Sequence, residues 1–273
     1  MAQSNNSIKK ILTVAFALCI VCSIIVSTAA VALRSKQQLN QELDRKSNIL
    51  AVADIYKPGI DVEKVYSEKI TPRVVNLETG EYSEQHDPQR YDGFQAARDP
   101  AQSRTLSGEK DIAGLSRIEN YSTVYLVGDP NDPQQIILPI RGQGLWGLMR
   151  GYLSVKGDGN TINGITFYSH SETPGLGGRV DDPRWKSQWE GKQIFADADS
   201  VQPAIKLVKG QASGETEVDA LSGASLTSKG VSNLVQFWLG PQGFGEYLAK
   251  FRKGVSPSAV QEAGTASKAT EGA

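Results

Sequence analysis

An uncharged run near the start of the chain limits what this sequence can fold into. Ile11–Leu33 contains no charged residue, no proline and no glycine. As a helix with a rise of ~1.5 Å per residue, the run would be about 34 Å long, and the hydrocarbon core of a bilayer is ~30 Å thick. The run therefore predicts a transmembrane helix over residues 11–33, preceded by a short N-terminal segment, residues 1–10.

A cleaved signal peptide is the alternative interpretation of the same run. The apolar region of a signal peptide is usually ~7–15 residues long, which is shorter than this run, although Ala30-Val31-Ala32 resembles a cleavage site. Basic residues flank both ends of the run, so they hardly decide its orientation. Because long domains cross membranes largely regardless of their charge, we expect the N-terminus inside the cell and the remaining chain outside the membrane.

The charge and the cysteine content argue against several classes of site. The sequence has 29 basic and 30 acidic residues and no long basic run, so no nucleic-acid partner is expected. Both cysteines, Cys19 and Cys22, lie inside the uncharged run on one helix face, and we interpret them as small packing residues. Metal ligands shared with a partner helix are the alternative. No other metal site is expected, because His86 and His170 are isolated and neither a further cysteine nor an H-E-x-x-H motif occurs in the sequence.

The segments after the uncharged run predict an α+β domain over residues 34–254, with an antiparallel sheet and flanking helices. Turn clusters such as Gly128–Pro133 join the strand-like segments, which indicates hairpins. Strands are expected at 73–77, 122–127, 135–140, 147–155, 161–168 and 204–208, and helices at 37–56, 61–69, 185–190, 226–239 and 244–252. From Val255 the chain is small, polar and aperiodic, which predicts a disordered tail over residues 255–273.

The turn before the helix at 226–239 carries the first candidate site. Its oxygen-bearing side chains, Asp219, Ser222, Ser225 and Thr227, surround Gly223 and Ala224. A helix start offers unpaired backbone N–H groups and the positive end of the helix dipole, which favour a phosphate or another anion. Gly223 allows the backbone to bend and a ligand to come close. The alternative is that Ser222 or Ser225 is simply an N-cap of the helix.

Two further glycine-rich segments carry candidate ligand-binding residues. In His170–Arg179, the side chains of Glu172 and Thr173 could hydrogen-bond a polar heterocycle, and the glycines that follow allow tight turns. The alternative is a tight loop in which Glu172 caps a nearby backbone group. In Arg141–Gly147, Trp146 could cover a flat ring, although core packing is the more frequent role of a tryptophan.

Taken together, these segments resemble a known family. Asp219–Ser225 resembles the motif at which FMN is joined through a phosphoester to a Thr or Ser hydroxyl, and the matching hydroxyl is that of Ser225. The segment that begins at His170 resembles the second signature of the same FMN-binding domain. With its single N-terminal span, the chain resembles the NqrC family, which belongs to the sodium-translocating NADH:quinone oxidoreductases. The related flavoprotein of the Rnf-type ferredoxin:NAD oxidoreductases is the alternative. The NqrC family usually has Thr at the attachment position.

The resemblance implies a flavoprotein subunit of NADH:ubiquinone reductase in a bacterial inner membrane, with its bulk domain on the periplasmic side. Covalent FMN on Ser225 would relay electrons from NADH toward ubiquinone, coupled to sodium export, while a partner protein of the complex would hold the NADH site. Other subunits of the complex and a flavin transferase that uses FAD are the implied partners. A non-redox, membrane-anchored binding module and a purely structural assembly protein are the alternatives from other classes.

The resemblance also implies which residues hold the cofactor. Lys209 is a candidate for the phosphate or a ring carbonyl, and Asp219 for a metal in the modifying enzyme or for shaping the loop. The implied cofactor-binding residues are Leu145, Trp146, Glu172, Thr173, Gly175, Leu176, Gly177, Lys209, Asp219, Ser222, Gly223, Ala224, Ser225 and Thr227. No catalytic residue is assigned.

Overall fold

The computed structural model describes residues 8–197, 199–255, 257, 259 and 260. The chain forms two compact units, Met1–Lys46 and Ser47–Ala273. The first unit consists, in its described part, of helix α1, Ile8–Val52, whose last residues belong to the second unit. Helix α1 contains the uncharged run and is long and apolar enough to cross a membrane.

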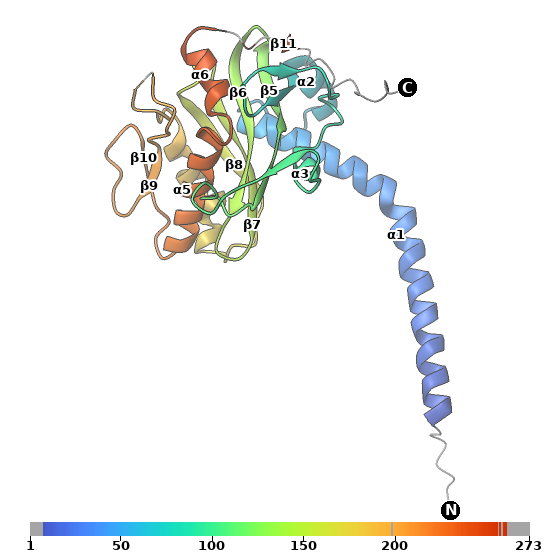
Figure 1. The fold of residues 1–273 in the computed structure, drawn as a ribbon. Coiled ribbons are helices and arrows are strands. Elements are labelled where there is room, and N and C mark those ends of the chain that lie inside the picture. The colour runs from blue at the N-terminus through green and yellow to red at the C-terminus, as the bar shows by residue number, and fades with distance from the viewer. Residues whose placement is uncertain (1–7, 198, 256, 258, 261–273) are drawn as a thin grey trace, which may run out of the picture. The chain divides into compact units, whose positions relative to one another are not determined.

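A seven-stranded sheet forms the centre of the second unit, in the order β11-β2-β1-β5-β6-β7-β8 (Figure 1). The strands are β1 Ile70–Asn76, β2 Tyr82–Ser83, β5 Tyr121–Asp129, β6 Asp132–Gln143, β7 Leu148–Lys156, β8 Ile162–Ser169 and β11 Ala259–Val260. Neighbouring strands pair antiparallel, except β11, which pairs parallel to β2. The structure thus confirms the predicted α+β fold with an antiparallel sheet.

Both faces of the middle strands are buried. Successive side chains of a strand point to opposite faces. Leu126 of β5 therefore packs in the core with helices α5, Ser225–Leu239, and α6, Gly245–Arg252, which cover one face in Figure 1. The neighbouring Tyr125 packs on the opposite face, against Ile49 and the residues around helix α2, Val62–Lys69. This two-sided burial explains why the middles of β5 and β6, Val124–Val127 and Ile136–Ile140, are continuous apolar runs in the sequence.

Helix α5 approaches the end of β6 closely enough to require glycine on both elements. A Cβ atom at Gly142 would lie 2.4 Å from the Cβ of Leu234, and one at Gly230 would lie 2.5 Å from the carbonyl oxygen of Gln143. The two glycines therefore let the middle of α5 pack directly against the end of β6.

The remaining elements are short. They are α3 Gly93–Ala96, β3 Ser103–Thr105, β4 Arg117–Glu119, η1 Gly177–Asp181, α4 Pro183–Lys186, η2 Ser187–Trp189, β9 Lys206–Val208 and β10 Glu217–Asp219. Strand β11 lies within residues 255–273, where a disordered tail is expected, and pairs parallel with β2. The predicted tail from residue 261 onward lies outside the described residues.

Candidate functional site

The carboxylate of Glu172 joins three segments that are separate in the sequence. Glu172 is only 5% exposed. Its Oε1 accepts hydrogen bonds from the backbone N–H groups of Leu145 (2.9 Å) and Trp146 (3.1 Å), in the β6–β7 loop. Its Oε2 accepts a hydrogen bond from the hydroxyl of Thr227 (2.5 Å), in the first turn of α5. Glu172 thus caps backbone groups, as one of the two interpretations of this loop expects.

Two glycines make room for this carboxylate. A Cβ atom at Gly144 would lie 2.4 Å from Oε1 of Glu172, and one at Gly177 would lie 2.6 Å from Oε2. Contacts this short do not occur between real side chains, so any larger residue would displace the carboxylate from its donors. Gly175 has a different role, because it adopts φ +76° in open space and forms the turn of the loop.

Four exposed apolar side chains lie on the segments that meet at Glu172. Leu145, Trp146, Leu176 and Leu226 are between 42% and 65% exposed, and we call them the apolar surface. The indole N–H of Trp146 donates to the hydroxyl of Thr173 (3.1 Å), which fixes the orientation of the ring. Trp146 is therefore not a core residue, and the more frequent role of a tryptophan does not apply here.

A side chain of α5 itself, Ser228, stabilises the turn at the start of the helix. The N-cap position is Ala224, which has no capping side chain, so the interpretation of Ser222 or Ser225 as the N-cap is wrong. Instead, the buried hydroxyl of Ser228 accepts from the N–H of Leu221 (2.9 Å) and donates to the carbonyl of Ala224 (3.0 Å). With Gly223 at φ +76°, these bonds fix the turn and leave Ser222 and Ser225 exposed.

Asp219 and Lys209 lie on the segments that lead into this turn. The carboxylate of Asp219 accepts from the backbone N–H of Ala212 (2.5 Å), which matches a loop-shaping role. Lys209 is exposed and directly follows β9. The carbonyl of Val208 accepts from the N–H of Ala220 (2.8 Å), so Lys209 lies next to the start of the turn.

His170 stabilises the loop that carries Glu172 through hydrogen bonds. The sequence alone does not predict this role. Its Nδ1 accepts from the backbone N–H of Glu172 (3.2 Å), and its Nε2 lies 2.9 Å from the carboxylate of Asp181. Because Nδ1 accepts, we assign the ring proton to Nε2, which donates to Asp181. Among the described residues, no group of three or more His, Cys, Asp or Glu side chains that could hold a metal is found, and Cys19 and Cys22 are exposed on α1.

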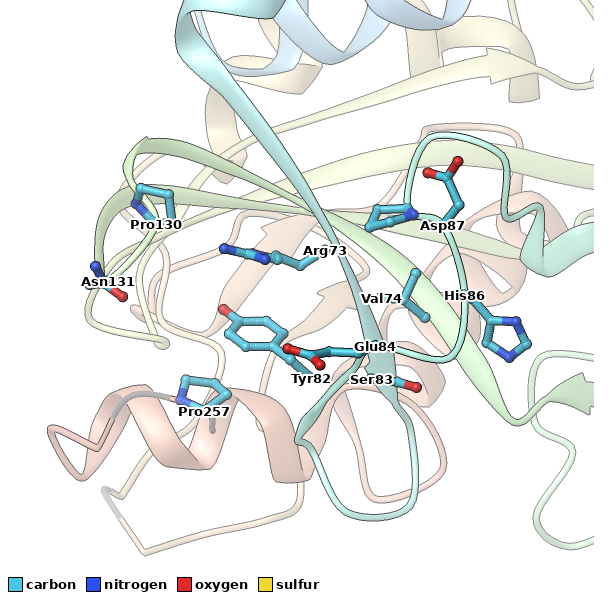
Figure 2. Close-up of a pocket in the computed structure, with 11 residues that line it drawn as sticks. Arg73, Val74, Tyr82, Ser83, Glu84, His86, Asp87, Pro130, Asn131 and Pro257 are labelled. Atoms are coloured by element: carbon cyan, nitrogen blue, oxygen red, sulfur yellow. The ribbon is translucent and has the colours of Figure 1, made fainter. Parts of the chain in front are cut away.

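A cavity of about 700 Å³ lies along β1, β2 and the loop after β2, and extends to the β5–β6 turn (Figure 2). The guanidinium of Arg73 lies 5.9 Å from the ring centre of Tyr82, and both line the cavity. Burial raises the pKa of Tyr82 and lowers the pKa of His86, which also lines it. None of the residues predicted to bind a cofactor lines this cavity, so the candidate site is the one around Glu172 and the start of α5.

Comparisons with known proteins agree with this location. The FMN-binding domain family matches residues 144–240, which contain every predicted cofactor-binding residue. The NqrC protein of the Na(+)-translocating NADH-quinone reductase of Vibrio alginolyticus is 48% identical over 256 residues, covering 93% of this chain and 99% of that protein. Its counterpart in Pseudomonas aeruginosa is 45% identical over 259 residues, covering 92% and 98%.

A comparison with solved structures also finds a protein of the same name. The crystal structure of Shewanella oneidensis NqrC matches with a TM-score of 0.69 and 34% sequence identity, covering 78% of this chain and 97% of that chain. The relatives that match over nearly their whole length carry the name of the sodium-translocating reductase, which favours the NqrC family over its Rnf counterpart. The chain belongs to the NqrC family, whose members are oxidoreductase subunits of the Na(+)-translocating NADH-quinone reductases.

Proposed function

We propose that this chain carries FMN bound covalently, through its phosphate, to the hydroxyl of Ser225. In this proposal the flavin relays electrons within the reductase complex, from NADH toward ubiquinone, coupled to sodium export. The observation that carries the proposal is the position of Ser225. Its exposed hydroxyl lies at a helix start without a capping side chain, next to the apolar surface.

The surroundings of Ser225 suit the parts of FMN. The unpaired N–H groups of the first turn of α5 favour a phosphate, and exposed Lys209 offers a positive charge nearby. The apolar surface suits a flat aromatic ring, because Trp146 and the leucines offer apolar area that is otherwise in water. The bound flavin would supply the electron-accepting group, while the chain orients it and sets its surroundings.

The structure favours Ser225 over the other hydroxyls of the turn. Thr227 is only 1% exposed and donates its hydroxyl to Glu172, so it serves the contacts that hold the site together. The hydroxyl of Ser228 is buried, and it already donates one hydrogen bond and accepts another. Ser222 is exposed, but it precedes Gly223 and lies outside the helix start.

The attachment requires a separate flavin transferase in this proposal. The Ser225 oxygen would form a bond to the FMN phosphorus of FAD while the pyrophosphate bond breaks, AMP leaves, and the hydroxyl proton passes to solvent. Ser225 is flanked by Ala224 and Leu226, and neither can act as an acid or a base. We also propose that the uncharged run of α1 spans the inner membrane, with the second unit on the periplasmic side, since long domains cross membranes largely regardless of their charge.

Intact-mass measurement of the full chain, co-expressed with a flavin transferase, tests the attachment. We expect the wild type and Ser225→Thr to gain one FMN moiety, and Ser225→Ala to gain none, because only the first two keep the acceptor oxygen. Ser213→Ala is the matched control, since it removes an exposed hydroxyl outside the predicted cofactor-binding residues, and it should load like the wild type. An unmodified wild type, or full loading of Ser225→Ala, would refute the proposal.

A further inference from the structure

Among the described residues, no cationic side chain forms an ion pair with Glu172. Its three hydrogen-bond partners, two backbone N–H groups and the Thr227 hydroxyl, all donate to the carboxylate and satisfy it without a proton. Because the side chain is buried, water screens this charge less than it screens a charge on the surface.

The apolar surface is built directly around this charge. Two of its members, Leu145 and Trp146, donate their own backbone N–H groups to the carboxylate. A third, Leu226, precedes the hydroxyl donor Thr227 in the chain. An aromatic ring held on this surface therefore lies within the field of Glu172.

We propose that Glu172 is a positioning residue whose fixed negative charge makes the flavin harder to reduce, in addition to holding the loops in place. The inference rests on the proposed function, in which the flavin occupies this surface. Glu172 exchanges no electron and no proton. Reduction brings electrons to the ring, and a neighbouring negative charge disfavours them, so the midpoint potential is lower than it would be beside a neutral side chain.

Glutamine at this position separates the charge from the hydrogen bonds. The amide oxygen of Glu172→Gln can accept from both backbone N–H groups, as Oε1 does now. Its NH₂ group can donate to the hydroxyl of Thr227, which then accepts instead of donating. The variant keeps the shape and the contacts of the site and removes one negative charge.

The test is a spectroelectrochemical titration of full-length, FMN-loaded protein at fixed pH. We expect Glu172→Gln to raise the midpoint potential, with the ratio of reduced to oxidised flavin increasing on the order of tenfold, or about 30 mV for a two-electron couple. Glu190→Gln is the matched control, because it removes the same charge from an exposed site, and its potential should equal that of the wild type. A loaded Glu172→Gln protein with an unchanged or lower potential would overturn the inference.

Two further measurements keep the outcomes separate. Intact mass reports whether each variant is loaded, so a wild type without FMN refutes the proposed function and the inference together, whereas loading without a shift in potential refutes the inference alone. Should Glu172→Gln fail to fold, Leu226→Lys and Leu226→Gln replace it, since both alter an exposed residue of the apolar surface. The lysine should compensate the carboxylate and give the higher potential of the two. Equal potentials would show that charge at this site does not reach the ring.

Discussion

His86 lies against two tyrosine rings in the wall of the cavity along β1 and β2. Its ring centre is 4.6 Å from that of Tyr91 and 5.0 Å from that of Tyr121. Burial lowers the pKa of His86 below its ordinary value of 6.5, because the charged imidazolium loses hydration there. The folded protein therefore favours the neutral ring more strongly than the unfolded chain does.

This difference makes stability depend on pH at the scale of one residue. When the pH falls below about 6.5, the pKa of His86 in the unfolded chain, the unfolded chain binds more protons than the folded protein. His86 therefore makes its whole contribution to the free energy of unfolding above about pH 6.5. That contribution is lost as the pH falls through the lower pKa of His86 in the folded protein. We expect acidification from about pH 7.5 to about pH 5.5 to lower the melting temperature of the wild type more than that of His86→Phe. Phenylalanine keeps the aromatic contacts and does not titrate. Equal losses in the two proteins would contradict this assignment.

Individual residues of the site are predictable from the sequence only where their chemistry is local. Gly223 is one of them, since a glycine before a helix start is typical of a positive φ. The hydroxyl of Ser228 gives a weaker signal, because a serine four residues after Ala224 is at the spacing that reaches back to its carbonyl. The partners of Glu172 give no such signal, since they lie 26, 27 and 55 residues away and meet only in the folded chain.

At the scale of elements, the close approach of α5 to β6 determines where the site forms. Gly230 faces the backbone of Gln143, and backbone cannot move aside as the end of a flexible side chain can. We expect Gly230→Ala to destabilise the fold by about 1–3 kcal/mol, even though alanine favours a helix by about 1 kcal/mol over glycine. Equilibrium unfolding in urea measures the change.

The control for this prediction is Gly108→Ala. A Cβ atom at Gly108 meets nothing within 4 Å, and its backbone is not in the left-handed region. Its free energy of unfolding should therefore stay within about 0.5 kcal/mol of the wild type. If both variants unfold at the same urea concentration as the wild type, the prediction is wrong, because α5 and β6 can then accommodate a methyl group at position 230.

Most of the longer elements are predicted closely from the sequence, and most of the shortest strands are not. The long strands β5, β6, β7 and β8 and the helices α2, α5 and α6 are found within a few residues of their expected positions, because apolar runs and turn clusters mark them. Strands β2, β3, β4 and β10 are only two or three residues long, which is too short for alternation to be recognised. Each of them is defined by its pairing with another strand, which a run of two or three residues does not reveal.

At the scale of the whole molecule, the proposed orientation can be tested with single cysteines. In a chain with Cys19 and Cys22 replaced by alanine, we expect Ser107→Cys, at an exposed position of the second unit, to react with a membrane-impermeant maleimide once the outer membrane is opened. Ser4→Cys, in the segment before the uncharged run, should react only after the cells are lysed. The reverse pattern would place the second unit in the cytoplasm.

The burial of β5 and β6 on both faces has a consequence for where any chemistry can occur in this fold. A flat molecule cannot lie on the middle of the sheet, because helices and loops of the second unit already occupy both sides. The loops at one end of the sheet hold the Glu172 contacts, and the cavity lies along β1 and β2. Sequence changes between relatives that alter the bound ligand, the partner or the redox potential should therefore concentrate at these two places, while the interior changes only as packing allows.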